Sequence, residues 1–181
     1  MNATQPSDPQ ILAATAEHLP AIAALAGVIW RACYPGIITS EQIEYMLAKM
    51  YSLDVLHAEI ETQGIRYVRL LASSKLSGFA SYGPTAEPGV IKLHKLYLLP
   101  SEHGRGWGSR LLQQIEREAR AGGAWRLTLA VNKRNTRALA AYRRNGFAIT
   151  ESVVTAIGQG FVMDDYLMAK EFTTPTPPRP A

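Results

Sequence analysis

The sequence of 181 residues contains a single cysteine, Cys33, so the chain cannot form an internal disulfide and offers no pair of thiolates to a metal. It also lacks any apolar run near the ~20 residues that a membrane-spanning helix requires. Residues 1–10 show neither the basic nor the apolar segment of a secretory signal peptide. These absences predict a protein of a reducing compartment, by default the cytoplasm, with no membrane partner and no metal.

The composition suits one globular domain. Hydrophobic residues make up 47% of the chain and charged residues 19%, which excludes a fibrous or wholly disordered protein. The length is enough for one core and short for two. The polar residues 1–10 and the proline-rich residues 173–181 are expected to be tails, because proline lacks a backbone donor. We therefore expect a single domain over residues 11–172.

Apolar spacing predicts helices first and strands later. Thr39 and Ser52 are placed to cap helices, and Gly64 to end one. The predicted helices are 17–31, one from residue 39 or 40, one from Ser52 to Gly64, 104–121 and 136–145. The predicted strands are 65–72, 76–82, 90–99, 125–131, 147–156 and 161–170. This order predicts an α/β (α+β) domain with a mixed sheet flanked by helices.

Positive charge is concentrated in one part of the chain. Residues 103–144 contain ten Lys and Arg against two Asp and Glu, whereas the segments before and after are both slightly acidic. Such a local field suits a polyanion, either nucleic acid or a small molecule with phosphates. No recognised nucleic-acid motif accompanies it, so the partner predicted here is not nucleic acid.

Three glycines, Gly104, Gly106 and Gly108, separate a predicted strand from a predicted helix. Glycine lets backbone N–H groups approach a ligand, and a helix N-terminus is partly positive, so this turn suits a pyrophosphate. Arg105 and Arg110 would add charge. The Gly-Lys-Ser/Thr of a P-loop is absent, and Ser109 interrupts the Gly-x-Gly-x-x-Gly of a dinucleotide fold.

A second segment, residues 131–147, reads VNKRNTRALAAYRRNGF. Its Asn135, Ala138, Tyr142, Gly146 and Phe147 follow the pattern Asn-x-x-Ala-x-x-x-Tyr-x-x-x-Gly-Phe. Together with the preceding glycine turn, this pattern resembles that of the GNAT superfamily of N-acetyltransferases. The resemblance extends over roughly residues 10–170 of the sequence.

The resemblance implies the GNAT fold, a mostly antiparallel twisted sheet whose splayed strands bind coenzyme A, and acetyl transfer from acetyl-CoA to an amine in a ternary complex. Tyr142 would protonate the departing thiolate, and a backbone N–H near Leu98 would polarise the thioester carbonyl. The residues that the resemblance assigns to the cofactor are Leu96, Tyr97, Leu98, His103, Gly104, Arg105, Gly106, Trp107, Gly108, Ser109, Asn135, Arg137 and Tyr142.

Two features of the site depart from the family or leave choices open. His103 stands where Gln or Arg is usual, although backbone donors should carry most of the phosphate binding. The strands 90–99 and 125–131 contain no acidic residue to act as the general base. His94 is the titratable candidate on the first of these strands, and Glu59 and Asp165 are alternatives.

The acceptor is less defined. Trp30, Tyr34, Tyr45 and Tyr51 could stack around a cation or simply pack helices together. The segments YPGIITSEQIEYML and GFVMDDYLMAK resemble those of PaiA-type polyamine acetyltransferases, and the Asp164-Asp165 pair in the second could attract a polyamine. Other interpretations are a protein or peptide N-acetyltransferase, or a non-catalytic acyl-CoA sensor. A homodimer is also possible by the same resemblance.

Overall fold

Seven strands form one sheet in the order β1-β2-β3-β4-β5-β7-β6 in the computed structural model, which describes residues 8–172. The strands are β1 (Gln10–Ala14), β2 (Arg66–Ala72), β3 (Lys75–Pro84), β4 (Val90–Leu98), β5 (Arg126–Asn132), β6 (Ala148–Gly158) and β7 (Phe161–Glu171). The helices are α1 (Leu19–Cys33), α2 (Ser40–Tyr51), α3 (Leu53–Glu61), α4 (Trp107–Ala121) and α5 (Thr136–Arg144), with short 3-10 turns at Ala16–His18 and Pro100–Glu102.

The pairing confirms a mixed, mostly antiparallel sheet. Among the described strands, β4 and β5 are the parallel pair and all other neighbours are antiparallel. The elements from α1 onward lie within a few residues of the predicted ones, whereas β1 has no predicted counterpart. The predicted tail residues 1–7 and 173–181 lie outside the described residues.

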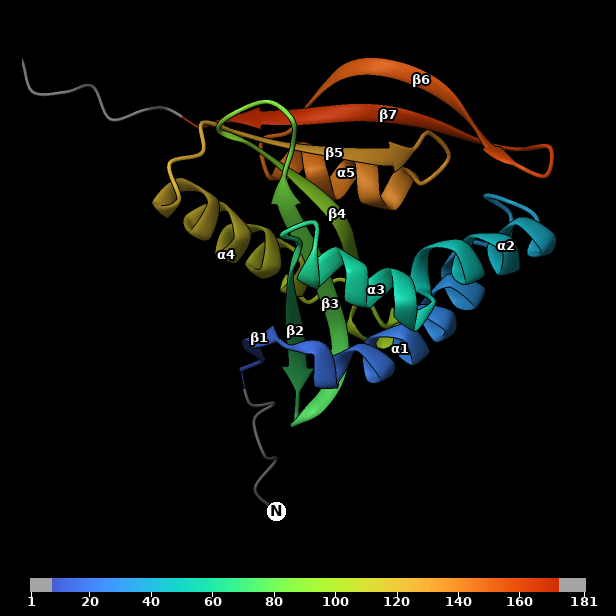
Figure 1. Cartoon of the computed structure of the whole chain (residues 1–181), viewed down its shortest axis with the longest axis horizontal. Helices are drawn as coiled ribbons and strands as arrows, with labels where there is room; N and C mark the ends of the chain where they lie inside the picture. Colours follow the sequence, from blue (N-terminus) through green and yellow to red (C-terminus); the bar gives the residue numbers. More distant parts are fainter. Residues whose placement is uncertain (1–7, 173–181) are drawn as a thin grey trace, which may run out of the picture.

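Helices cover both faces of the sheet (Figure 1). The helices α1–α3 lie over strands β2–β4 on one face, and their apolar side chains form one core around Trp30, Leu56 and Phe79. The helices α4 and α5 lie on the opposite face over a second core, which contains Ile115 and Met168. No helix in residues 8–172 is long and apolar enough to cross a membrane.

Local sequence determines where several elements begin and turn. The Thr39 side chain accepts a hydrogen bond from the backbone N–H of Gln42 (3.2 Å), as expected of a helix cap. Ser52 caps α3 in the same way. The turn between β2 and β3 places Ser73 and Ser74 at φ of 48° and 61°, the left-handed geometry that matches the twist of a two-residue hairpin.

The aromatic set of the first helices packs the core. Trp30 is 1% exposed and stacks on Tyr34 with ring centroids 4.4 Å apart, and Tyr51 meets Trp30 edge-on at 6.0 Å. Tyr45 stands apart and donates a hydrogen bond to the backbone carbonyl of Ile157 (2.5 Å). The packing role therefore accounts for Trp30, Tyr34 and Tyr51, and these rings do not form an open cage for a cation.

A buried ion pair fixes α3 to β4. The Lys95 ammonium, in a residue only 2% exposed, contacts both carboxylate oxygens of Glu59 at 2.5 and 2.6 Å. The Tyr67 hydroxyl donates to the same carboxylate. Burial lowers the pKa of Lys95, and Glu59 opposes that shift by stabilising the charged amine. Removing one partner would leave the other charge buried without compensation.

We predict that Glu59→Gln lowers the free energy of unfolding by about 3–5 kcal/mol, because Lys95 would lose its buried counter-ion. Urea denaturation at pH 7 measures the change. The control Glu44→Gln removes a carboxylate from a solvent-exposed pair with Arg31 and should leave the transition midpoint near that of the wild type. Replacing both partners with apolar residues, Glu59→Leu with Lys95→Met, should recover much of the lost stability. No recovery would show that the pair does not act as one unit.

Candidate functional site

The strands β4 and β5 part in the middle of the sheet. Their parallel pairing runs from Val90 opposite Arg126 to Leu93 opposite Leu129. Beyond that point β4 stays paired with β3 as far as Leu98, and β5 stays paired with β7 as far as Asn132. Beyond Leu93, the facing backbone edges of β4 and β5 are therefore not paired with each other. An extended ligand can hydrogen-bond to such an edge as an added strand.

The parting coincides with a β-bulge at His94. Ser81 pairs with Lys95 while Tyr82 pairs with Leu93, so His94 is the extra residue on β4. Its Nε2 is buried and has no hydrogen-bond partner among the described residues. Burial, with the positive charges of Lys92 and Lys95, lowers the pKa of His94 to about 4. The imidazole is thus neutral at pH 7 and a weaker base than a free histidine, and its predicted role as general base stays a prediction.

The glycine turn leads directly into α4, as predicted. Gly104 and Gly106 have φ of 76° and 81°, and a Cβ on either would meet no atom within 4 Å. The left-handed backbone explains why glycine occupies these two positions. The open space around them leaves room for a ligand to approach the backbone N–H groups at the start of α4. Ser109, in the first turn of α4, accepts a hydrogen bond from the Asn145 side chain at the end of α5 (3.0 Å).

His103 links this turn to its surroundings. Its Nε2 lies 3.1 Å from the carbonyl oxygen of Leu98, and its Nδ1 contacts the Arg137 guanidinium of α5. Burial lowers the pKa of His103, so the ring is neutral at pH 7. The histidine that departs from the family pattern therefore connects the end of β4 to α5.

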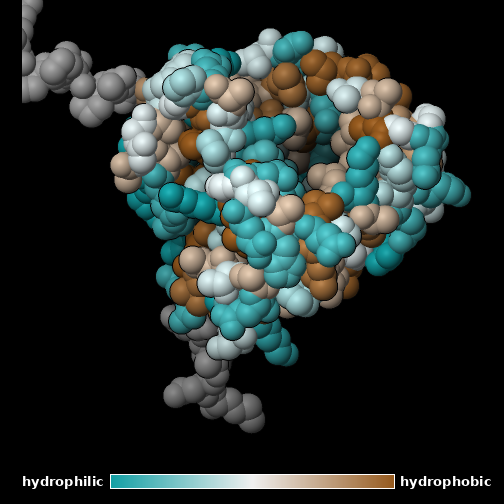
Figure 2. Space-filling model, in the orientation of Figure 1, coloured by the Kyte–Doolittle hydropathy of each residue, from teal (hydrophilic) through white to brown (hydrophobic). Residues whose placement is uncertain are grey.

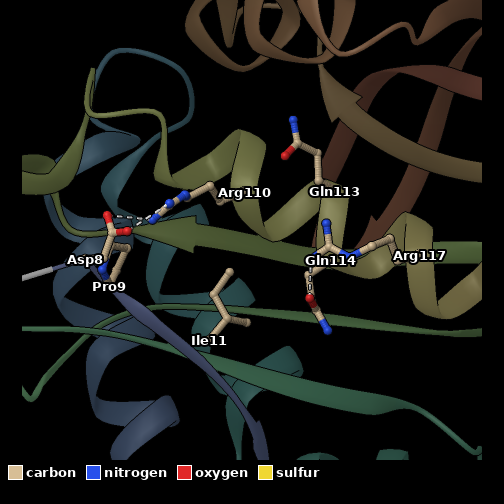
Figure 3. Close-up of a pocket in the computed structure, with 7 residues that line it drawn as sticks. All are labelled: Asp8, Pro9, Ile11, Arg110, Gln113, Gln114 and Arg117. Atoms are coloured by element: carbon tan, nitrogen blue, oxygen red, sulfur yellow. Dashed lines mark hydrogen bonds and ion pairs between the residues drawn. The ribbon is translucent and has the colours of Figure 1, made fainter.

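Arg105 of the glycine turn and Arg110 of α4 already have acidic partners. Arg105 and the Trp107 indole N–H both contact one Glu102 carboxylate oxygen at 3.0 Å. Arg110 extends from α4 toward the start of β1, where it holds Asp8 with two hydrogen bonds of 3.0 and 3.2 Å (Figure 3). That contact borders a hollow of about 430 Å³ between β1 and α4. These arginines offer less uncompensated charge to an anion than the sequence suggested.

The second motif begins at Asn135, whose side chain accepts the backbone N–H of Ala138 (3.1 Å) and so caps α5. Tyr142 is half-buried and meets Phe147 edge-on at 5.8 Å. Burial, and to a lesser degree the neighbouring Tyr34, raise the pKa of Tyr142 well above 10. The phenol is therefore protonated at neutral pH, as a proton donor must be.

The side chains of β4 divide between the two cores. Tyr97 packs with Trp30 and Phe79 on the α1 side, at centroid distances of 5.8 and 5.6 Å. Leu96 and Leu98 pack on the opposite side with α4 and α5. With these side chains directed to the two faces of the sheet, the backbone of Leu96–Leu98 lies along the open edge of β4.

A hollow of about 450 Å³ lies where the α1–α2 loop faces the ends of β5 and β7. Figure 2 shows the surface hollowed between α2 and α3 on one side and strands β5 and β7 on the other. The residues that line the 450 Å³ hollow are Gly36, Ile37, Ile38, Thr39, Gln42, Asn132, Arg134, Val162 and Asp164. Within residues 8–172, no group of three or more His, Cys, Asp or Glu is arranged to hold a metal ion.

Arg134 has a structural role that the sequence pattern does not predict. Its guanidinium donates to the carbonyl oxygens of Gly36 (2.6 Å) and Ile37 (2.9 Å), so it joins the β5–α5 loop to the α1–α2 loop. Its own backbone N–H donates to the Asn132 side chain (2.9 Å). Nothing in the sequence distinguishes this arginine from the other basic residues of residues 103–144, because its partners are carbonyl groups about a hundred residues away.

Comparison with known proteins identifies the family. The sequence model of the acetyltransferase (GNAT) family matches residues 28–147. The chain belongs to this family.

Individual relatives agree with that assignment. An uncharacterized N-acetyltransferase of Mycobacterium bovis is 37% identical over 81 residues, which is 45% of this chain and 51% of that protein. The chain thus spans about half the length of these mycobacterial relatives. A spermidine N(1)-acetyltransferase of Thermoplasma acidophilum is 28% identical over 82% of this chain and 91% of its own. The crystal structure of the PaiA N-acetyltransferase from that organism, in complex with coenzyme A, superposes with a TM-score of 0.78 at 26% identity and covers 91% of this chain and 99% of that one.

We predict that Arg134→Ala speeds amide hydrogen exchange at Ile37 and Ile38, because the α1–α2 loop would lose two charge-assisted hydrogen bonds. Exchange measured by mass spectrometry on a peptide covering residues 35–40 tests this. Arg144→Ala, which removes an exposed arginine at the end of α5, should leave that peptide unchanged. Equal exchange in the wild type and Arg134→Ala would mean that other contacts hold the loop.

Proposed function

We propose that this protein transfers an acetyl group from acetyl-CoA to a primary amine, by direct attack within a ternary complex. The observation that carries the proposal is the parting of β4 and β5, which opens a backbone edge between the glycine turn and Tyr142. Family membership and the named acetyltransferases among the relatives support it. So does the relative whose structure contains coenzyme A.

In this proposal the cofactor lies along the open edge. The pantetheine arm pairs with the backbone of Leu96–Leu98, and the pyrophosphate binds the N–H groups of residues 104–109 at the start of α4. His103 and Arg137, which contact each other, lie beside the turn, where Arg137 can reach a phosphate. Asn135 bonds the pantetheine or a water next to it while also capping α5.

The chemistry needs a proton donor for the leaving group. The neutral amine nitrogen attacks the thioester carbon, the C–N bond forms, the C–S bond breaks and the acylated nitrogen loses a proton. Tyr142, protonated at neutral pH, then gives its proton to the thiolate of coenzyme A. In this proposal a backbone N–H of β4 near Leu98 polarises the thioester carbonyl.

The acceptor we propose is a small amine, with polyamines as the first class to test. The relative named a spermidine N(1)-acetyltransferase matches most of this chain. Near the start of β7, Asp164 lines the hollow of about 450 Å³ and Asp165 follows it. A protein or peptide N-terminus is the alternative acceptor.

We predict that Tyr142→Phe lowers kcat by roughly 10²–10⁴-fold, because the thiolate would leave without a proton donor. Release of coenzyme A thiol should be measured with spermidine, spermine, amino acids, aminoglycosides and short peptides. Tyr82→Phe, which removes a hydroxyl bound to Glu118 of α4 outside the site, serves as the control and should keep wild-type kcat. Tight acetyl-CoA binding without turnover on any amine would favour a sensor module over an enzyme.

We also predict that Gly106→Ala weakens coenzyme A binding by tenfold or more, because its methyl group would enter the space in front of α4. Gly123→Ala is a matched control, since Gly123 has φ of 82° and equally open surroundings at the other end of α4. Both substitutions place alanine in a left-handed conformation and should cost about 1–2 kcal/mol of stability. Calorimetric titration with coenzyme A compares the affinities of the two variants. Equal affinities would contradict the pyrophosphate assignment.

A further inference from the structure

Asp165 on β7 is a buried carboxylate that the described structure does not satisfy. The residue is 8% exposed, and its Oδ1 has no hydrogen-bond partner among residues 8–172. Burying a charged oxygen without a partner is costly, and native proteins rarely keep such a group unless it has a function. Burial and the adjacent Asp164 raise the pKa of Asp165, while Lys133 and Lys92 lower it.

The position of Asp165 places it beside the opened part of the sheet. It pairs across the sheet with Asn132, the last residue of β5, beyond the point where β4 and β5 part. Met163, two residues earlier on the same strand, packs against the core of α1–α3. Because side chains alternate along a strand, Asp165 faces that same side of the sheet, the side on which Figure 2 shows the hollow.

The neighbouring charges leave Asp165 available. Lys133 is engaged by Asp164, with which it forms an ion pair. Lys92, on β4, is exposed to solvent and makes no ion pair among the described residues. Tyr34, from the end of α1, is close enough for the Asp165 charge to raise its pKa. A ligand that bears a positive charge and hydrogen-bond donors would satisfy the free oxygen.

We propose that Asp165 receives the acceptor amine: its carboxylate binds the ammonium group and takes the proton that the nitrogen loses before attack. This assignment rests on the proposed acetyl transfer and names the acceptor contact within it. It also predicts a preference for acceptors that are cationic at neutral pH.

In the proposed step, Asp165 accepts a proton before the amine attacks. One N–H bond of the ammonium group breaks and its proton passes to Oδ1 of Asp165, which leaves a lone pair on nitrogen. That lone pair forms the C–N bond with the acetyl carbon, the C–S bond breaks with its electrons on the sulfur, and Tyr142 protonates the thiolate. The acylated nitrogen then loses its second proton, which restores the Tyr142 phenol and leaves the neutral amide. Asp165 then releases its proton to solvent. His94 is less suited to this task, since its imidazole is neutral at pH 7 and carries no charge to attract an ammonium group.

The test compares Asp165→Asn with Glu171→Gln, which removes a carboxylate from an exposed position further along the same strand. Acetyl-CoA affinity is measured first by calorimetry and should be equal in all three proteins. With the best alkylamine of the panel, Asp165→Asn should lower kcat/KM at pH 7 by roughly 10²-fold or more. Glu171→Gln should match the wild type.

The pH profile separates a proton acceptor from a structural residue. Without Asp165 the enzyme depends on free amine, so kcat/KM of Asp165→Asn should rise about tenfold per pH unit toward the amine pKa near ~10. The wild type should be flatter, and the gap between the two should narrow with an aromatic amine that is neutral at pH 7. A loss equal at every pH, or a wild-type profile in Asp165→Asn, overturns the proposal. An alkaline rise of kcat/KM in His94→Gln and not in Asp165→Asn also overturns the proposal.

Stability gives an independent readout. A carboxyl whose pKa is raised by folding destabilises the folded state as pH rises through that pKa. The unfolding free energy of the wild type relative to Asp165→Asn should therefore fall between pH 4 and pH 7, and a residue with a structural partner would show the opposite trend. If the wild type acetylates no amine at all, the proposed function fails and this assignment fails with it; normal turnover by Asp165→Asn overturns this assignment alone.

Discussion

Four residue pairs of parallel sheet, ending at Leu93 and Leu129, determine how the two halves of this molecule meet. Up to that point β4 and β5 satisfy each other's backbone groups, and beyond it each strand is held only by its outer neighbour. The bulge at His94 shifts the pleat of β4 where the parting begins, so that Lys95 and Tyr97 turn to one core and Leu96 and Leu98 to the other. The two cores lie on opposite faces of the sheet, and the candidate site lies where β4 and β5 part.

Two buried charged residues near this gap, Lys95 on β4 and Asp165 on β7, differ in whether their charge has a partner. Lys95 is fully compensated by Glu59 and by the hydroxyl that supports that carboxylate, so it joins α3 to β4 and has no capacity left for a ligand. Asp165 is buried to a similar degree but keeps one oxygen without a partner. The first arrangement joins two elements of the fold, whereas the second leaves a buried oxygen whose charge is relieved by protonation and would be relieved by a bound cation.

Much of the fold could be predicted from the sequence, because periodicity, caps and glycine stops are local properties. The strand β1 was missed because five residues, QILAA, are too few to show a period. The motif around Asn135 and Tyr142 indicated the family, since its spacing is encoded within one helix, and the roles of these residues stay predictions. The bulge at His94, the burial of the Tyr97 ring and the contacts of Arg134 depend on partners from distant segments, and no local pattern specifies them.

The bonds from Arg134 to the α1–α2 loop have a consequence for ligand binding. Arg134 lies immediately before Asn135, so the loop that would hold the pantetheine arm also holds the loop that borders the acceptor hollow. The two loops are therefore coupled, and a ligand that orders one of them would reduce the entropic cost of ordering the other. Because such coupling is reciprocal, a ligand bound at either loop would assist binding at the other by the same factor.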